Sequence, residues 1–131
     1  MYAIEKQPFG FKLVFKGRIS ASEMQRWVDE SRAALSSAPA SFGLFMDMRD
    51  LQPLPPESQR VMLEGQRLYQ RCGMRRSVVI IQTPSTCMQF TRLAQESGIH
   101  YWERYISAEN TPDWEAKGWA WIQNAVDPDA S

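Results

Sequence analysis

Two short apolar runs constrain the fold of this chain more than any other feature. Residues 42–46 read FGLFM and residues 77–81 read SVVII, and polar or turn-forming residues bound both runs. Each run is followed by a segment with helical periodicity. Continuous apolar runs of this length are typical of strands that are covered on both faces, as parallel strands in α/β sheets are. The sequence therefore predicts a compact α/β domain.

Composition and charge limit the classes of protein to which the chain can belong. Of its 131 residues, 44% are hydrophobic and 23% are charged, which is typical of a globular domain and not of a disordered chain. The formal net charge is zero, so no overall field attracts nucleic acid or an anionic membrane, and we expect no nucleic-acid partner. No apolar stretch approaches the roughly 20 residues that span a bilayer, so no transmembrane segment is expected.

The amino terminus and the two cysteines indicate the compartment. The first six residues lack the basic and apolar regions of a signal peptide. Cys72 and Cys87 are too few and too far apart for a disulfide framework or a Cys-x-x-Cys site. We therefore expect two reduced thiols in a cytoplasmic protein.

The predicted elements follow the order β-β-α-β-α-β-α-β-α. Strands are predicted over residues 2–7, 11–16, 42–48, 77–82 and 101–107. One helix is predicted after each of Ser20, Thr83 and Asn110, and another begins near Glu57. The first two strands should form an antiparallel hairpin. Each later strand is followed by a helix, so the mixed sheet should be mostly parallel and flanked by helices. Residues 1–126 are predicted to form one domain, with residues 127–131 as a flexible tail.

Periodicity also predicts which residues the helices bury. The first helix should bury Met24, Trp27, Val28, Ser31 and Leu35. The second should bury Val61, Gly65, Leu68 and Cys72. The last should bury Trp114, Gly118, Trp121, Ile122 and Ala125.

Three segments give the chain a resemblance to a known family. Residues 45–51 (FMDMRDL) precede the second helix, and residues 105–107 (YIS) and 114–122 (WEAKGWAWI) lie in the last strand and helix. Together with the element order, they resemble the SpoIIAA-like family, the bacterial STAS/SEC14 group. The resemblance covers nearly the whole chain and implies a single STAS-type domain. Better-understood STAS members are regulatory partners such as anti-anti-sigma factors, which implies regulation by protein contact.

The chain departs from those members at the start of the second helix. They carry Asp-Ser-Ser-Gly there, including a serine that a partner kinase phosphorylates, whereas this chain has Pro55-Pro56-Glu57-Ser58. The phosphorylated position falls on or beside Glu57, with Ser58 next to it. Either Glu57 supplies a fixed negative charge in place of a phosphate, or it is an ordinary acid favoured by the helix dipole. The sequence does not decide whether Ser58 is phosphorylated.

The carboxyl ends of the parallel strands form the predicted binding edge, because helix N-termini present free amides there. The side chains expected at this edge are Arg18, Ser20, Asp47, Arg49, Asp50, Ser58, Thr83 and Ser85. The candidate residues for binding a partner or ligand are Arg49, Asp50, Glu57, Ser58, Thr83 and Ser85. The alternative is that the hydroxyls only cap helices and the charged residues pair within their loop.

The sequence offers little for catalysis, so we expect no enzyme. His100 is the only histidine, and with two scattered cysteines it gives no metal-binding spacing, so neither a metal nor a cofactor is expected. The sequence contains no glycine-rich phosphate loop and no nucleophile elbow. Asp47 and Asp50 flank Arg49, which should keep them ionised instead of raising a pKa for acid catalysis.

Two further groups of side chains have both a structural and a functional interpretation. Arginines 67, 71, 75 and 76 cluster near the end of the second helix, where the helix dipole favours cations. The alternative is a nucleic-acid surface, which would need basic or aromatic support elsewhere and which the neutral total charge disfavours. Trp119 lies off the buried stripe of the last helix, and Trp102 lies on a predicted edge strand. Large aromatic residues usually belong to the core. If Trp119 shares a surface with Trp102 or its neighbour Tyr101, that surface is either a self-association patch of a homodimer or the wall of an apolar ligand cavity.

Two functions remain in competition. In the first, the chain is a non-catalytic regulatory module of the STAS type that binds a protein through the loop and helix near residues 49–58. In the second, it carries or senses a small apolar, lipid-like ligand in a cavity between sheet and helices, as the SEC14 side of the resemblance implies. The identity of the partner and the pathway cannot be read from the sequence.

Overall fold

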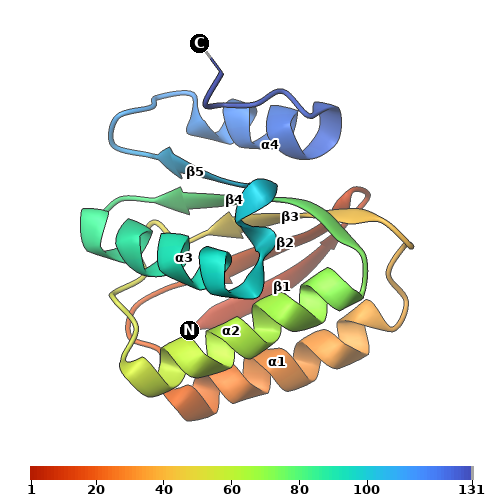
Figure 1. The fold of residues 1–131 in the computed structure, drawn as a ribbon, viewed down its shortest axis with the longest axis vertical. Coiled ribbons are helices and arrows are strands. Elements are labelled where there is room, and N and C mark those ends of the chain that lie inside the picture. Colours follow the sequence, from red (N-terminus) through yellow and green to blue (C-terminus); the bar gives the residue numbers. More distant parts are fainter. Residues whose placement is uncertain (131) are drawn as a thin grey trace.

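The computed structural model describes residues 1–130 and shows a five-stranded sheet with helices on both faces (Figure 1). The strands are β1 (Tyr2–Gln7), β2 (Gly10–Phe15), β3 (Phe42–Asp47), β4 (Met74–Ile81) and β5 (Glu103–Ser107). The helices are α1 (Ala21–Leu35), α2 (Pro56–Arg71), α3 (Pro84–Ser97) and α4 (Trp114–Asn124), and the 3-10 turn η1 (Ile99–Tyr101) precedes β5. The predicted α/β class is confirmed.

The strands lie in the sheet in the order in which they occur in the chain. β1 and β2 form the expected antiparallel hairpin, and β2 to β5 pair in parallel. Helices α1, α2 and α3 cover one face of the sheet, and α4 covers the other (Figure 1). The carboxyl ends of the parallel strands therefore meet at one end of the sheet. We call this the carboxyl end, and the opposite one the amino end.

The three-helix face holds the larger core. All five residues predicted on the buried stripe of α1 are buried. Trp27 of α1 stacks on Tyr69 of α2, with ring centroids 5.7 Å apart, and packs edge-on against Phe15 of β2 at 5.2 Å. A Cβ at Gly65 would lie only 2.1 Å from the Trp27 ring, so this glycine permits the close approach of α1 and α2.

The buried side of α2 differs from the prediction. Gly65 and Leu68 are buried as expected, but Val61 and Cys72 are only half-buried. The interior side consists of Ser58, Met62, Gly65, Gln66, Leu68 and Tyr69. Because α2 packs against α1, α3 and the sheet at once, two polar residues turn inward, and apolar spacing alone does not fix the rotation of the helix.

The α4 face has a smaller core. Its buried members are Phe45, Val78, Ile80, Ile106, Trp121 and Ile122. Gly118 lies against the ring of Phe45, where a Cβ would come within 2.5 Å of it. Trp121 and Ile122 face inward as predicted, whereas Ala125 is exposed and forms the left-handed cap of α4.

Two segments differ from their predicted structure. β4 begins at Met74, three residues earlier than expected, and residues 99–101 form η1 before the last strand.

The segment predicted as a loose tail is attached to β5 through Asp127, whose carboxylate accepts hydrogen bonds from Arg104 at 2.9 and 3.1 Å. Ser131, also assigned to that tail, lies outside the described residues. In the part of the chain that the structure describes, no helix has the length and apolar character to cross a membrane.

Candidate functional site

Three loops meet at the carboxyl end of the sheet and are tied together by hydrogen bonds. The Gly17 amide donates to the carbonyl of Asp50 at 2.8 Å, and the Gln52 amide donates to the carbonyl of Gly17 at 3.0 Å. From the loop after β4, the side-chain amide of Gln82 donates to the carbonyl of Arg49 at 3.1 Å. The loops after β2, β3 and β4 therefore form one joined surface.

The proline-rich connection from β3 to α2 is held in place by buried leucines and by hydrogen bonds to α2 and α3. Leu51 and Leu54 are buried in the three-helix core. The Leu54 amide donates to the Gln89 side chain at 2.8 Å, and the Leu54 carbonyl accepts from the side chains of Gln59 and Gln89 at 2.9 and 3.2 Å. These contacts satisfy the backbone of Leu54, and the parallel bridge between Leu51 and Gly17 ties the connection to the loop after β2, so its shape is fixed.

Asp47 and Arg49 pair with each other at the end of β3. The Arg49 guanidinium donates to both carboxylate oxygens at 3.0 and 2.9 Å, and its backbone amide adds a third bond at 3.2 Å. Burial alone would raise the pKa of Asp47, but the hydrogen bonds and charge of Arg49 outweigh it and hold that pKa below its usual value. The prediction that Arg49 keeps this carboxylate ionised is confirmed. The guanidinium also lies 4.4 Å from the ring centroid of Trp114.

Ser58 and Thr83, two of the predicted binding residues, form hydrogen bonds within the chain. Ser58 is 0% exposed, and its hydroxyl donates to the carbonyl of Ile19 at 2.8 Å. It therefore joins α2 to the loop before α1 and is not accessible at the surface. Thr83 is the N-cap residue of α3, as predicted, but its hydroxyl bonds to that of Thr86 at 2.8 Å and not to a helix amide.

Apart from Ser58, the predicted binding residues, Thr83 included, reach the surface. Asp50, Glu57 and Ser85 are exposed, and the Arg49 side chain is 38% exposed. Glu57 lies in the first turn of α2, where the helix dipole favours its charge. The carboxyl end thus presents a mixed pattern of charges on a rigid support.

Trp102 and Trp119, predicted to form a self-association surface, have partners within the chain. Trp119 stacks on Phe45 with ring centroids 4.4 Å apart and lies 4.7 Å from the ring of Phe9. Trp102 is half-buried and packs against both cores. Among residues 1–130, the large hydrophobic residues that are exposed are Met1, Met88, Tyr101 and Val126.

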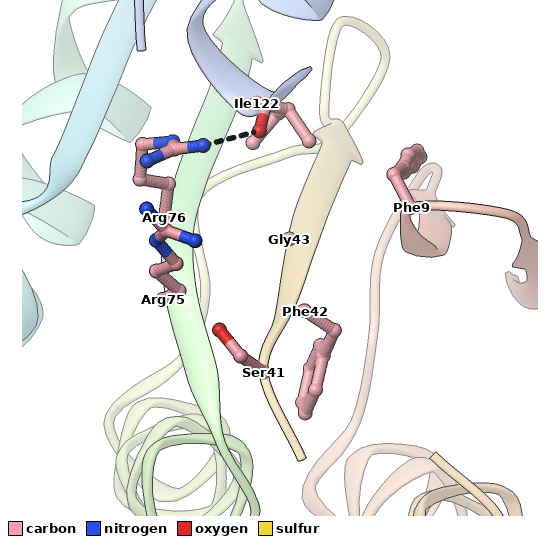
Figure 2. Close-up of a pocket in the computed structure, with 7 residues that line it drawn as sticks. All are labelled: Phe9, Ser41, Phe42, Gly43, Arg75, Arg76 and Ile122. Carbon is pink, nitrogen blue, oxygen red and sulfur yellow. Dashed lines mark hydrogen bonds between the residues drawn. The ribbon is translucent and has the colours of Figure 1, made fainter. Parts of the chain in front are cut away.

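A second candidate site lies at the amino end, on the α4 face. A hollow of about 110 Å³ lies there, lined by Arg75, Arg76, Ser41, Phe9 and Ile122, among others. Figure 2 shows these side chains. The two arginines were expected near the end of α2 with Arg67 and Arg71, but they belong to β4. The helix dipole therefore does not account for their positions. The sequence signal that could have identified them is a pair of basic residues at the start of an apolar strand.

Glu103 is a buried carboxyl that the sequence analysis missed. It begins β5 and is 3% exposed. It accepts hydrogen bonds from the hydroxyls of Ser77 at 3.0 Å and Tyr105 at 2.6 Å. Burial raises the pKa of Glu103 to about 7, and the two hydrogen bonds oppose this only in part. β5 is an edge strand of the sheet, as predicted, yet the core beneath α3 covers the side chain of Glu103.

None of the residues described forms a cluster of three His, Cys, Asp or Glu side chains that could hold a metal ion. Comparison with known proteins adds no assignment: no family model matches the chain, and no curated protein matches it. The resemblance to the SpoIIAA-like family therefore stays a prediction from the sequence.

Proposed function

We propose that this chain acts without catalysis, as a regulatory module that binds a protein partner through the carboxyl end of its sheet. The observation that carries the proposal is the joined surface of the three loops, with Arg49, Asp50 and Glu57 presented on it. Loops that are already ordered lose little conformational entropy when they bind, so their charges can contribute to recognition.

The chemistry of this surface favours binding over reaction. Its buried carboxylate, Asp47, has a lowered pKa and is held by Arg49, so it is a poor proton donor near neutral pH. The exposed charges of Asp50 and Glu57 suit a partner with a complementary basic patch. Regulation through phosphorylation of Ser58 has no support from its position, because a kinase would have to displace α2 to reach the hydroxyl.

The alternative, a lipid-like ligand held between sheet and helices, has less support. The space lined by Trp27, Met46, Met62 and Tyr69, between the sheet and helices α1 and α2, amounts to about 10 Å³. That is no more than the roughly 10–15 Å³ that a cavity needs to hold a single water. An acyl chain would require the core to open.

A charge-reversal pull-down tests the proposed function. The variant Asp50→Lys/Glu57→Lys reverses two exposed charges at the carboxyl end. The control Glu30→Lys/Glu96→Lys makes the same charge change at exposed positions on α1 and α3, away from the carboxyl end. In an extract of the source cells, we expect proteins captured by the wild type to be lost from the first variant and retained by the control. Equal capture by all three proteins would contradict the proposal.

A further inference from the structure

We propose that the hollow beside Arg75 and Arg76 binds phosphate, either as the free ion or as a phosphate monoester. This site lies at the amino end of the sheet, so it does not depend on the protein-binding surface proposed above. The inference rests on the shape of β4, the charges around the hollow and the hydrogen-bond capacity of its side chains.

A β-bulge brings the two arginines to one side of the sheet. Phe42 pairs with Met74, but the next residue of β3, Gly43, pairs with Arg76, so Arg75 is an extra residue in β4. Successive residues of a regular strand point to opposite faces. Met74 is buried in the three-helix core, whereas Arg75 and Arg76 both line the hollow on the α4 side (Figure 2). Bulges commonly redirect side chains in this way near functional sites.

The two guanidinium groups lack an acidic partner. Neither Arg75 nor Arg76 forms an ion pair with any residue in the range 1–130, although Arg32, Arg49 and Arg104 each do. Burial lowers the pKa of Arg76, and the positive charge of Arg75 lowers it further. A bound dianion would offset both effects, because it supplies the missing countercharge beside the two guanidinium groups.

Arg76 is held in place and keeps donors free. Its Nη2 donates to the carbonyl of Ile122, near the end of α4, at 3.0 Å. This bond orients the guanidinium, and within the described chain it is the one hydrogen bond that the group makes. The hydrogen bond to the last turn of α4 gives Arg76 a structural role as a cap of that helix. It does not account for Arg75, which lies beside Arg76 without a hydrogen-bond or ion-pair partner among the described residues.

The donors around the hollow match the chemistry of phosphate. Guanidinium groups bind phosphate through paired N–H donors. Two positive charges are balanced by a phosphate dianion, whereas a single carboxylate would balance only one of them. The hydroxyl of Ser41 adds a donor from the start of β3, and Figure 2 shows it on the same side as Arg75. Phe9 and Ile122 complete the lining of the hollow with apolar side chains.

Calorimetric titration with inorganic phosphate tests the site. At constant ionic strength and pH 7.5, we expect saturable binding of one phosphate per chain. Arg75→Gln should weaken binding at least tenfold, because it removes an exposed guanidinium that makes no hydrogen bond or ion pair with the described residues. Arg76→Lys, which keeps the charge but loses the forked donors, should weaken it severalfold. Arg71→Gln, at the exposed end of α2, is the matched control and should stay within twofold of wild type.

Several outcomes would overturn the proposal: no saturable binding of phosphate, equal binding of acetate, or unchanged binding by Arg75→Gln. Circular dichroism and thermal unfolding confirm that each variant is folded. Sedimentation with phosphatidylcholine vesicles that contain phosphatidic acid identifies the source of the phosphate. Vesicle binding that free phosphate displaces assigns the site to a lipid headgroup. Binding of soluble phosphate without vesicle binding assigns it to a small soluble ligand.

Discussion

The two ends of the sheet contain similar charged side chains in opposite electrostatic situations. At the carboxyl end, Asp47 and Arg49 neutralise each other through three hydrogen bonds. At the amino end, Arg75 and Arg76 lie together on one face without an acidic partner, and Glu103 is buried on the other face without a basic one. The sheet separates these opposite charges, so they cannot pair.

This difference indicates how each end can function. The Asp47–Arg49 pair at the carboxyl end stabilises the loops, and the exposed charges of Asp50 and Glu57 remain for a large partner. The amino end keeps uncompensated charge, which costs stability in the free protein and provides affinity for a small charged ligand. Four predictions test this contrast, from the largest expected effect to the smallest.

The largest effect is expected from a charge placed inside the carboxyl end. Ser58→Glu would bury an uncompensated carboxylate beneath α2, so the free energy of unfolding should fall by about 3–5 kcal/mol. Ser58→Ala removes the hydrogen bond to Ile19 without adding charge and should cost only about 1–3 kcal/mol. Urea unfolding of both variants measures the difference. A Ser58→Glu protein as stable as wild type would show that this end is not closely packed.

The second effect concerns Glu103 and the dependence of stability on pH. Because its pKa rises from 4.5 in the unfolded chain to about 7 in the folded protein, the folded state binds the proton more tightly. The contribution of Glu103 to the free energy of unfolding is fully present below pH 4.5 and is lost as the pH rises to about 7, a loss of up to roughly 3 kcal/mol.

Glu103→Gln provides the matched variant for this pH dependence. The amide can accept from Ser77 and donate to Tyr105, as the protonated acid would. We expect the variant to match wild type near pH 4.5 and to exceed its stability at pH 8. Chemical unfolding at a series of pH values measures this, and equal pH profiles of the two proteins would refute the assignment.

The third effect is smaller, and the stability that it concerns is lost as the pH falls instead of as it rises. The lowered pKa of Asp47 means that its contribution is present above pH 3.8 and is lost as the pH falls through the still lower folded value. Asp47→Asn should destabilise the protein by about 1 kcal/mol at pH 7, because the exposure of Arg49 screens the pair. This difference should shrink on acidification. Thermal unfolding at pH 7 and pH 3 compares the two proteins, and a cost that does not change with pH would exclude the ion pair as its cause.

The smallest effect on stability is expected at Arg75. Its side chain is exposed and makes no ion pair with the described residues, so Arg75→Gln should change the free energy of unfolding by less than about 0.5 kcal/mol in phosphate-free buffer. Urea unfolding checks this value. A loss of more than 1 kcal/mol would show that Arg75 has a structural partner and that the two ends differ less than described.

The sequence predicted the fold well where one signal dominates. The stripe on α1 was correct in all five residues because that helix has one buried side. The stripe on α2 was partly wrong because Ser58 and Gln66 are buried polar residues, which apolar periodicity cannot reveal. The pairing of Asp47 with Arg49 was predictable, since the residues are two positions apart at the end of a strand.

The amino end could not be predicted in the same way. The bulge at Arg75 depends on the register between β3 and β4, and register is a property of two strands that no local pattern records. The burial of Glu103 depends on the coverage of β5 by the core beneath α3. Both features require the assembled sheet, which is why the arginines were assigned to a helix end and the burial of Glu103 was not predicted.

The most direct test of the contrast between the two ends is a phosphate titration followed by two-dimensional amide NMR. We predict that the amides of Ser41, Gly43, Arg75 and Arg76 shift with a common saturation curve, while those of Asp50 and Glu57 stay unchanged. Equal shifts at the two ends, or shifts confined to the carboxyl end, would contradict the account.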